Sequence, residues 1–346
     1  MNNENDLLYS KFPLRCGADG KFRVLVLSDA HAGVGFSKQV APAIRALLTA
    51  DRPDLVIFNG DTAGPGHIHV ENAEQLRAVL TELTSPVEEL GIPWAHTFGN
   101  HDDNFGLKNE DAEKVYESFP HCVSKTGDPA VSGVANYVLP VLGRDGAPAF
   151  AVWGLDSHGD LRSNFKHWGV AEDARYVLPV HFAEGTGYDT VRFDQAMWYY
   201  NASKQIEQRC GRKLPGLMCM HIPLPEMWLV ANNRAETGFS GNVREEIACS
   251  EMNSGLFMAC LERGDVRAIV FGHDHVNDFT GEYCGITLAY DAGIEYDAYQ
   301  DDDLRGGRMF VLDENDPHRF ETYMVRVRDI MGAAGDRNPP RAVPGG

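Results

Sequence analysis

The sequence predicts an α/β fold with a mostly parallel sheet, and the first hundred residues carry most of this prediction. The segments 22–28, 55–60 and 92–98 are continuous apolar runs, which are typical of strands buried on both faces. Apolar residues recur at helical spacing in the segments between them, at 40–48 and at 76–90. This alternation is typical of βαβ units, whose strands lie parallel in one sheet.

Proline and glycine set the ends of the predicted helices. Asp51-Arg52-Pro53 ends the first helix, because a proline disfavours helical backbone at the residue before it. Pro86 either kinks the second helix or begins a new turn after Ser85, and Gly91 ends it.

The rest of the chain mixes strands, helices and loops. The apolar runs 137–142 and 149–155 flank turn-forming residues at 143–146 and predict a β-hairpin. Residues 157–190 are rich in glycine, histidine and aspartate without a clear period, so we expect loops there. The remaining elements are expected to be a helix at 193–210, a strand at 218–221, a helix at 253–263, a strand at 265–272 and several strands up to about residue 327.

We expect a single domain, because the chain contains no internal repeat and no linker that would divide it. Residues 1–20 are predicted to form an irregular lead-in, and residues 21–330 the domain. Residues 331–346 are rich in glycine, proline and arginine and are predicted to form a disordered tail.

Composition excludes several functions. The net charge of −19 argues against nucleic acid as a partner, because phosphate backbones bind basic surfaces. No membrane association is expected, since no apolar run is long enough to span a bilayer. Residues 1–6 lack the features of a signal peptide, so we expect a cytoplasmic protein if the chain is full length and a secreted one if a signal peptide was removed. The seven cysteines form no CxxC pair, which favours reduced thiols.

Five apolar runs end in residue types that bind metals. Ligands of an open α/β sheet lie outside the carboxyl ends of its strands, so these residues are expected to meet at one site. The residues at these ends are Asp29 and His31; Asp61; Asn100, His101 and Asp102; His221; and His273 and His275.

The ligand types indicate the metals. Carboxylate, imidazole and amide ligands without thiolate suit Mn, Fe, Co, Ni or Zn. Two ions about 3.5–4 Å apart, as in two-metal hydrolases, need a shared carboxylate. Asp61 is the best candidate for this bridge, because it stands alone on the tight turn at Gly60 between the other ligand loops.

The arrangement of these motifs resembles a known family. The matching strings are Asp29-x-His31, Gly60-Asp61, Gly99-Asn100-His101-Asp102, His221 and Gly272-His273-x-His275. On these residues the chain is identified as a member of the calcineurin-like metallophosphoesterase superfamily. Within it, the chain resembles the purple-acid-phosphatase-like branch, which includes members regarded as inactive. The strings that support this finer match are Gly187-Tyr188-Asp189, Asp194-Gln195 with Trp198, His221-Ile222-Pro223-Leu224-Pro225-Glu226, Asn253-Ser254-Gly255 and the run 264–278.

The resemblance implies a fold, a cofactor and a ligand set. The implied fold is a four-layer α-β-β-α sandwich of two mixed sheets, with helices on both outer faces and the metal site at the carboxyl ends of the strands. The implied cofactors are two divalent or mixed-valence transition metal ions. The implied ligands are Asp29, His31, Asp61 and His275 for the first metal, and Asp61, Asn100, His221 and His273 for the second.

The resemblance also implies a reaction, the hydrolysis of a small phosphorylated substrate by a metal-bridging hydroxide. His101 resembles the family's general acid or transition-state stabiliser and is expected to assist the leaving group. Asp102 is expected to orient His101 by accepting its other N–H. Two alternatives to a general phosphatase or phosphodiesterase stay open. They are a phosphodiesterase specific for cyclic nucleotides and a catalytically silent protein that binds metal.

The chain departs from the family pattern in three places. Gly64 stands where purple acid phosphatases have a tyrosine ligand, so we expect neither the purple colour nor an enforced Fe(III) site. The first motif is Asp-x-His rather than Asp-x-Gly, which adds His31 to the first site. Segment 291–296 replaces a glycine-rich segment, and its Asp291 and Glu295 are expected to repel a doubly charged phosphate monoester.

Other polar residues have weaker claims to a function. His67, His69 and His158 are candidate substrate contacts, and the alternative for each is an exposed loop histidine. The run 301–303, three aspartates, lacks the spacing of an EF-hand and is expected to be a solvated acidic loop.

Overall fold

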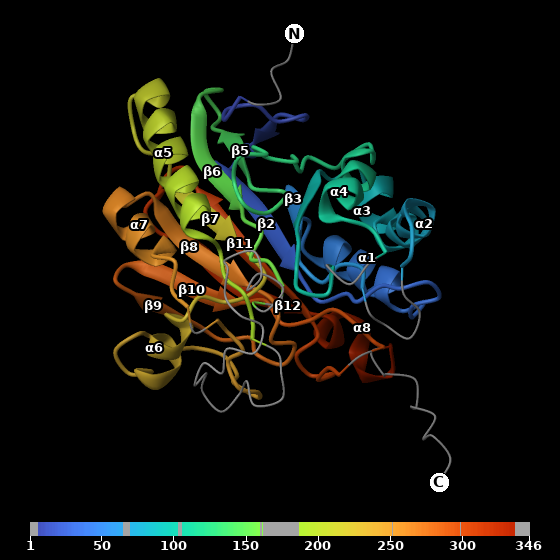
Figure 1. The fold of residues 1–346 in the computed structure, drawn as a ribbon. Helices are drawn as coiled ribbons and strands as arrows, with labels where there is room; N and C mark the ends of the chain where they lie inside the picture. Colours follow the sequence, from blue (N-terminus) through green and yellow to red (C-terminus); the bar gives the residue numbers. More distant parts are fainter. Residues whose placement is uncertain are drawn as a thin grey trace, which may run out of the picture.

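Two mixed sheets pack against each other in the computed structural model, with helices outside both of them (Figure 1). The structure describes residues 6–64, 70–102, 106–159, 161, 187–250, 252–297 and 299–335. The predicted α/β class and its two mixed sheets are confirmed.

The five-stranded sheet contains the three strands predicted in the first hundred residues. Its order is β12 (Glu321–Arg326), β11 (Gly306–Asp313), β2 (Lys21–Leu27), β3 (Leu55–Asn59) and β4 (Trp94–Thr97). The strands β2, β3 and β4 are parallel, whereas β11 is antiparallel to both of its neighbours. All residues of β3 are buried, as expected for a strand covered on both faces.

The seven-stranded sheet is also mixed. Its order is β1 (Leu14–Arg15), β5 (Tyr137–Leu142), β6 (Pro148–Gly154), β7 (Gly216–Cys219), β8 (Val266–Phe271), β10 (Ile286–Tyr290) and β9 (Thr280–Tyr283). The predicted hairpin is β5–β6, and the run from β6 through β7 and β8 to β10 is parallel.

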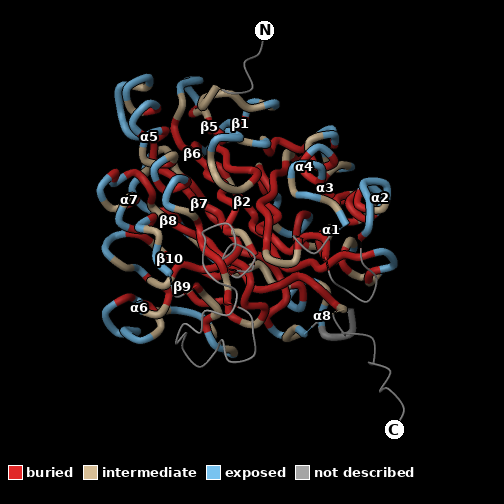
Figure 2. Tube along the Cα trace, in the orientation of Figure 1, coloured by how far each residue is buried: buried red, intermediate tan, exposed pale blue. Residues whose placement is uncertain are grey.

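Helices cover both outer faces, which completes four layers (Figure 1). The helices α1 (Val40–Ala50), α2 (Ala73–Leu83), α3 (Ser85–Glu89) and α4 (Asn109–Glu117) lie on the side of the five-stranded sheet. On the other side lie α5 (Phe193–Cys210) and α7 (Leu256–Arg263). Along β8, Ala268 and Val270 pack into the core between the sheets, while Ile269 and Phe271 pack beneath α5 and α7. Figure 2 shows the buried residues concentrated in the strands and the exposed ones on the outer helices.

Some boundaries differ from the prediction. The lead-in contains β1, because the buried Leu14 pairs with Val141 of β5. Residues 331–335 of the predicted tail belong to α8 (Val327–Gly335), which packs beside α1; residues 336–346 lie outside the described residues. Two short helices, α4 and α6 (Met227–Asn232), were not predicted. Among the described residues, no helix combines the length and the apolar character that a membrane span requires.

Candidate metal centre

The predicted ligands gather where the carboxyl ends of the two sheets meet. Asp29 and His31 follow β2, Asp61 follows β3, and the loop 99–102 follows β4. His221 follows β7, and His273 and His275 follow β8. The side-chain amide of Asn59 ties the sheets together here, because it donates to the carbonyl oxygens of Met220 (3.0 Å) and Val270 (3.3 Å).

The first group of ligand atoms comes from Asp29, His31 and His275, all of which are buried. His275 Nε2 lies 3.3 Å from Asp29 Oδ1 and 3.1 Å from His31 Nε2. The distance from His31 Nε2 to Asp29 Oδ1 is 3.8 Å. One cation can therefore contact all three side chains.

The second group comes from Asp61, His221 and His273, which are also buried. His221 Nε2 lies 3.2 Å from Asp61 Oδ2. Asn100, the remaining predicted ligand, stands in the loop after β4, and its Oδ1 atom is buried.

Asp61 faces both groups. Its Oδ2 atom lies 3.2 Å from His221 Nε2 of the second group and 3.8 Å from His31 Nε2 of the first. Its other oxygen, Oδ1, accepts the backbone N–H of His101 at 2.8 Å. This fixes the carboxylate with one oxygen directed at the space between the groups, as a bridging ligand requires.

The chemistry of the ligand atoms fits two cations. The buried atoms that form no regular hydrogen bond within the described part of the chain include Asp29 Oδ1, Asp61 Oδ2, His221 Nε2 and His273 Nε2. Buried polar atoms are normally paired, since leaving one unpaired costs roughly 1–3 kcal/mol. Oxygen and imidazole nitrogen donors of this kind bind Mn, Fe, Co, Ni or Zn.

The protonation of two ligand histidines suits metal binding. Burial lowers the pKa of His31 to about 4 and that of His273 to about 3, because a buried imidazolium is poorly solvated. Both rings are therefore neutral at pH 7, and each has a lone pair to offer to a metal ion.

Outer hydrogen bonds orient the other two imidazoles. His221 Nδ1 lies 2.9 Å from the carbonyl oxygen of Asn59, and His275 Nδ1 lies 2.9 Å from that of Tyr299. Glu295 Oε1 lies 3.2 Å from the same nitrogen of His275. Donation from Nδ1 leaves each Nε2 atom as the one directed at the metal site.

The carboxylates of segment 291–296 lie behind the ligands, which corrects the expectation that they repel the substrate. Glu295 is buried on the far edge of His275. Asp291 is buried 2.7 Å from Ser28 Oγ, which is itself 2.5 Å from Asp29 Oδ2. Burial and the neighbouring Asp29 raise the pKa of Asp291 well above its usual value. The sequence positions these residues near the site, but only packing decides on which side of the ligands they lie.

The backbone around the ligands is strained and tightly packed. Asp29, His31, Asp61 and His273 all have positive φ, from 43° to 75°, a rare conformation for residues other than glycine. A Cβ atom at Gly60 would lie 2.5 Å from the ring of His221, so only glycine allows this turn.

His101 lies beside the two groups and belongs to neither of them among the described residues. Its ring centroid is 5.3 Å from that of His31. The structure gives Asp102 hydrogen bonds other than the predicted one to His101. Its two oxygens accept the backbone N–H groups of Gly99 (2.8 Å) and Ala63 (3.3 Å), which ties the loop after β4 to the loop after β3.

The weaker histidine candidates differ in position. His158 Nε2 lies 2.9 Å from Gln195 Oε1 of α5, so the ring is anchored to a helix rather than exposed. His67 and His69 lie outside the described residues.

Sequence reasoning missed two tyrosines at the site. The ring of Tyr188 is nearly perpendicular to that of His273, with centroids 4.3 Å apart, and Tyr299 stacks on His275 at 4.2 Å. Neither follows a strand end or a metal motif. The tyrosine of Gly187-Tyr188-Asp189, which contributed to the family resemblance, was the only signal.

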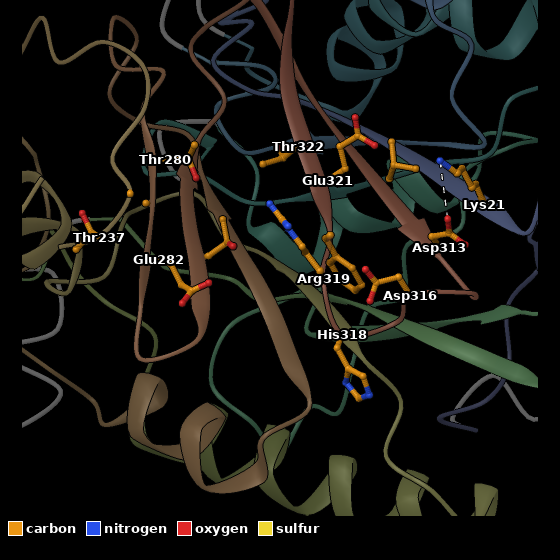
Figure 3. A pocket seen from close by; sticks show the side chains of 15 residues that line it. Lys21, Thr237, Thr280, Glu282, Asp313, Asp316, His318, Arg319, Glu321 and Thr322 are labelled. Atoms are coloured by element: carbon orange, nitrogen blue, oxygen red, sulfur yellow. Dashed lines mark ion pairs between the residues drawn. The ribbon is translucent and has the colours of Figure 1, made fainter. Parts of the chain in front are cut away.

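A cavity lies elsewhere, between the edge strands of the two sheets (Figure 3). It has a volume of about 890 Å³ and includes Lys21, at the start of β2, paired with Asp313 at 3.8 Å. The predicted ligand Asp29 follows the opposite end of β2. The cavity is lined by charges of both signs and by none of the predicted site residues.

Comparisons with known proteins agree with this geometry. The sequence pattern of the calcineurin-like phosphoesterase family matches residues 22–277. An Arabidopsis thaliana protein named probable inactive purple acid phosphatase 14 is 31% identical over 320 residues, which cover 84% of this chain and 75% of that protein. Another, probable inactive purple acid phosphatase 29, is 29% identical over 331 residues, 87% and 79% of the two chains. A dimetal phosphatase from Danio rerio has a similar fold, with a TM-score of 0.52 and 12% identity over 88% of this chain and 98% of that one.

Proposed function

This chain belongs to the calcineurin-like phosphoesterase family, and from that premise we propose that it hydrolyses phosphate esters at a centre of two metal ions. The observation that carries the proposal is the position of Asp61 Oδ2, 3.2 Å from His221 Nε2 and 3.8 Å from His31 Nε2. Two ions held there supply Lewis-acid stabilisation for charge on a phosphoryl group and lower the pKa of a nucleophilic water.

The side chains have separate roles in the proposed reaction. The first ion is assigned to Asp29, His31, Asp61 and His275, and the second to Asp61, Asn100, His221 and His273. Hydrolysis adds water to phosphorus and breaks the bond to the ester oxygen, which leaves as an alcohol after gaining a proton. His101 is half-buried beside the ligands, and we assign it the donation of that proton. Asp102 holds the loop that carries His101.

Phosphate monoesters and diesters are both included in the proposed substrate class. The carboxylates that would repel a dianionic monoester, Asp291 and Glu295, are buried behind the ligands instead of facing the substrate. The geometry therefore supports a phosphatase as well as a phosphodiesterase.

A catalytically silent metal protein is the competing function, and the word "inactive" in the names of the Arabidopsis relatives favours it. The presence of His101 favours an enzyme, because this histidine is not needed to complete either ligand group. The two functions predict the same metal content and opposite results in a hydrolysis assay.

The test combines metal analysis with hydrolysis. Protein freed of metal and reconstituted with Mn or Zn is expected to bind two ions per chain and to hydrolyse 4-nitrophenyl phosphate or its bis-ester. Asp61→Asn should lose both ions and nearly all activity, because it contacts both groups, whereas His31→Ala should keep the second ion. Asp316→Asn, an exposed change in the remote cavity, is the matched control. At most one ion in the native protein, or equal losses in the two variants, would contradict the bridging role. Two ions without hydrolysis of either ester would indicate the silent protein.

A further inference from the structure

Tyr299 places an aromatic ring directly on the first metal group. Its ring stacks on the imidazole of His275 with centroids 4.2 Å apart and only 3° between the planes. The residue is nevertheless 49% exposed. One face therefore covers a predicted metal ligand, while about half of the residue stays exposed.

Hydrogen bonds hold this ring in place. The hydroxyl of Tyr299 donates to Glu245 Oε2 at 2.9 Å, and Glu245 Oε1 accepts the backbone N–H of Val276 at 2.8 Å. The carbonyl oxygen of Tyr299 accepts from His275 Nδ1 at 2.9 Å. An exposed aromatic ring that is already fixed loses little entropy when a ligand stacks on it, so it makes an effective binding surface.

Tyr299 also lines a cavity beside the metal centre. The cavity has a volume of about 590 Å³, and its other walls include Val276, Arg244 and the loop 300–303. Each aspartate of this loop pairs with an arginine: Asp301 with Arg244, Asp302 with Arg305 at 2.7 Å, and Asp303 with Arg328. The acidic loop is thus held by ion pairs instead of being simply solvated, and its charges are balanced. A cavity wall with balanced charges suits an uncharged group of the substrate better than a second phosphate group.

We propose that Tyr299 binds the leaving group of the substrate by stacking, so that the site prefers phosphate monoesters whose alcohol carries an uncharged aromatic ring, such as nucleoside monophosphates. The inference rests on the proposed phosphoesterase function and specifies its substrate class. In the reaction, water adds to phosphorus, and the bond between phosphorus and the ester oxygen breaks. The products are inorganic phosphate and the alcohol that carries the aromatic ring.

Adenosine 5′-monophosphate and ribose 5-phosphate form the best pair of substrates for a test. In both, the ester oxygen is on the 5′ carbon of ribose, so the leaving-group chemistry matches and only the adenine differs. The wild-type protein, loaded with Mn or Zn, should have the higher kcat/KM for the nucleotide. Tyr299→Leu should reduce that preference by about 2- to 13-fold, the range for loss of one aromatic pair. Its kcat/KM for ribose 5-phosphate should stay within about twofold, and Tyr299→Phe, which keeps the ring, should retain the preference.

Binding gives a readout that does not need turnover. Equilibrium dialysis of adenosine against the metal-loaded protein should show weaker binding by Tyr299→Leu than by Tyr299→Phe. Tyr323→Leu is the matched control, because Tyr323 is 36% exposed and its hydroxyl also donates to a carboxylate, that of Asp51. This variant should behave as wild type in both assays.

Three results would overturn the inference. The first is an unchanged substrate preference and unchanged adenosine binding in Tyr299→Leu. The second is an equal fall for both substrates with loss of metal, which would make Tyr299 only a support for His275. The third is adenosine binding that is no tighter than ribose binding in the wild-type protein. If adenosine binds as expected but no ester is hydrolysed, the stacking surface stands and the proposed hydrolysis is refuted.

Discussion

Replacement of His101 by alanine tests whether this side chain protonates the leaving oxygen. The backbone N–H of His101, which donates to Asp61 Oδ1 at 2.8 Å, remains in the variant. The ring itself lies 5.3 Å from that of His31 and belongs to neither ligand group among the described residues. We therefore expect His101→Ala to keep both metal ions.

The loss of rate should depend on the leaving group. Removal of a general acid costs about 10²–10⁴-fold, which corresponds to roughly 2.7–5.4 kcal/mol of activation free energy. An alkoxide cannot leave without a proton, so an alkyl phosphate should show the whole loss. Nitrophenolate leaves readily as an anion, so 4-nitrophenyl phosphate should lose less than about tenfold.

The assay is kcat/KM for both esters, measured on protein whose metal content is known. His318→Ala removes an exposed histidine from the remote cavity and serves as the control. Equal losses on both esters with both metals present would show that His101 stabilises the phosphoryl group instead. Loss of one ion would show that it is a ligand. Either result refutes its role as general acid.

Two further predictions concern the metal ligands and the missing tyrosine. Burial opposes the charge on His221, but the carboxylates of Asp61 and Asp29 outweigh it and raise its pKa to about 10 in the metal-free protein. A metal ion must displace this proton, so the affinity of the protein for metal should rise with pH up to about 10. Calorimetry of metal binding near pH 7, in buffers that differ in their heat of ionisation, should detect the released proton. Binding without proton release would contradict this prediction. Gly64→Tyr should lower the free energy of unfolding by about 1–3 kcal/mol, because a Cβ atom there would lie 2.7 Å from the carbonyl oxygen of His101. Urea denaturation measures this loss, and Gly238→Tyr is the control, because the described atoms leave open space at Gly238. A stable Gly64→Tyr variant that turns purple with Fe(III) would contradict the prediction.

The sequence was sufficient for the positions that depend on local pattern. The strands β2, β3 and β4 are mostly apolar and buried, so their ends could be located within a few residues. Each ligand follows such an end closely, and parallel strands bring their carboxyl ends to one edge of a sheet. Topology alone therefore gathers ligands that follow strands of one sheet, such as Asp29 and Asp61, while the packing of the two sheets brings His275 beside Asp29.

The sequence could not predict on which side of a neighbouring residue a side chain lies. Glu295 and Asp291 were correctly expected near the site, but their burial behind His275 and Asp29 is a result of packing. Asp102 similarly accepts backbone donors from a neighbouring loop. The short helix α6 has only Met227 and Val230 buried, which is too few apolar positions to reveal a helical period.

The unpaired ligand atoms bear on whether this protein still binds metal. The buried atoms Asp29 Oδ1, Asp61 Oδ2, His221 Nε2 and His273 Nε2 form no regular hydrogen bond within the described part of the chain, and an unpaired buried polar atom costs roughly 1–3 kcal/mol. The close approach of His221 to Asp61 recovers part of this cost in the metal-free protein, but the strained backbone at Asp29 and His31 adds to it. Cations would satisfy these atoms together, so loss of metal binding would leave the rest of this cost without compensation. A silent member of the family would therefore still be expected to hold its metals, and turnover is the property that separates it from an enzyme.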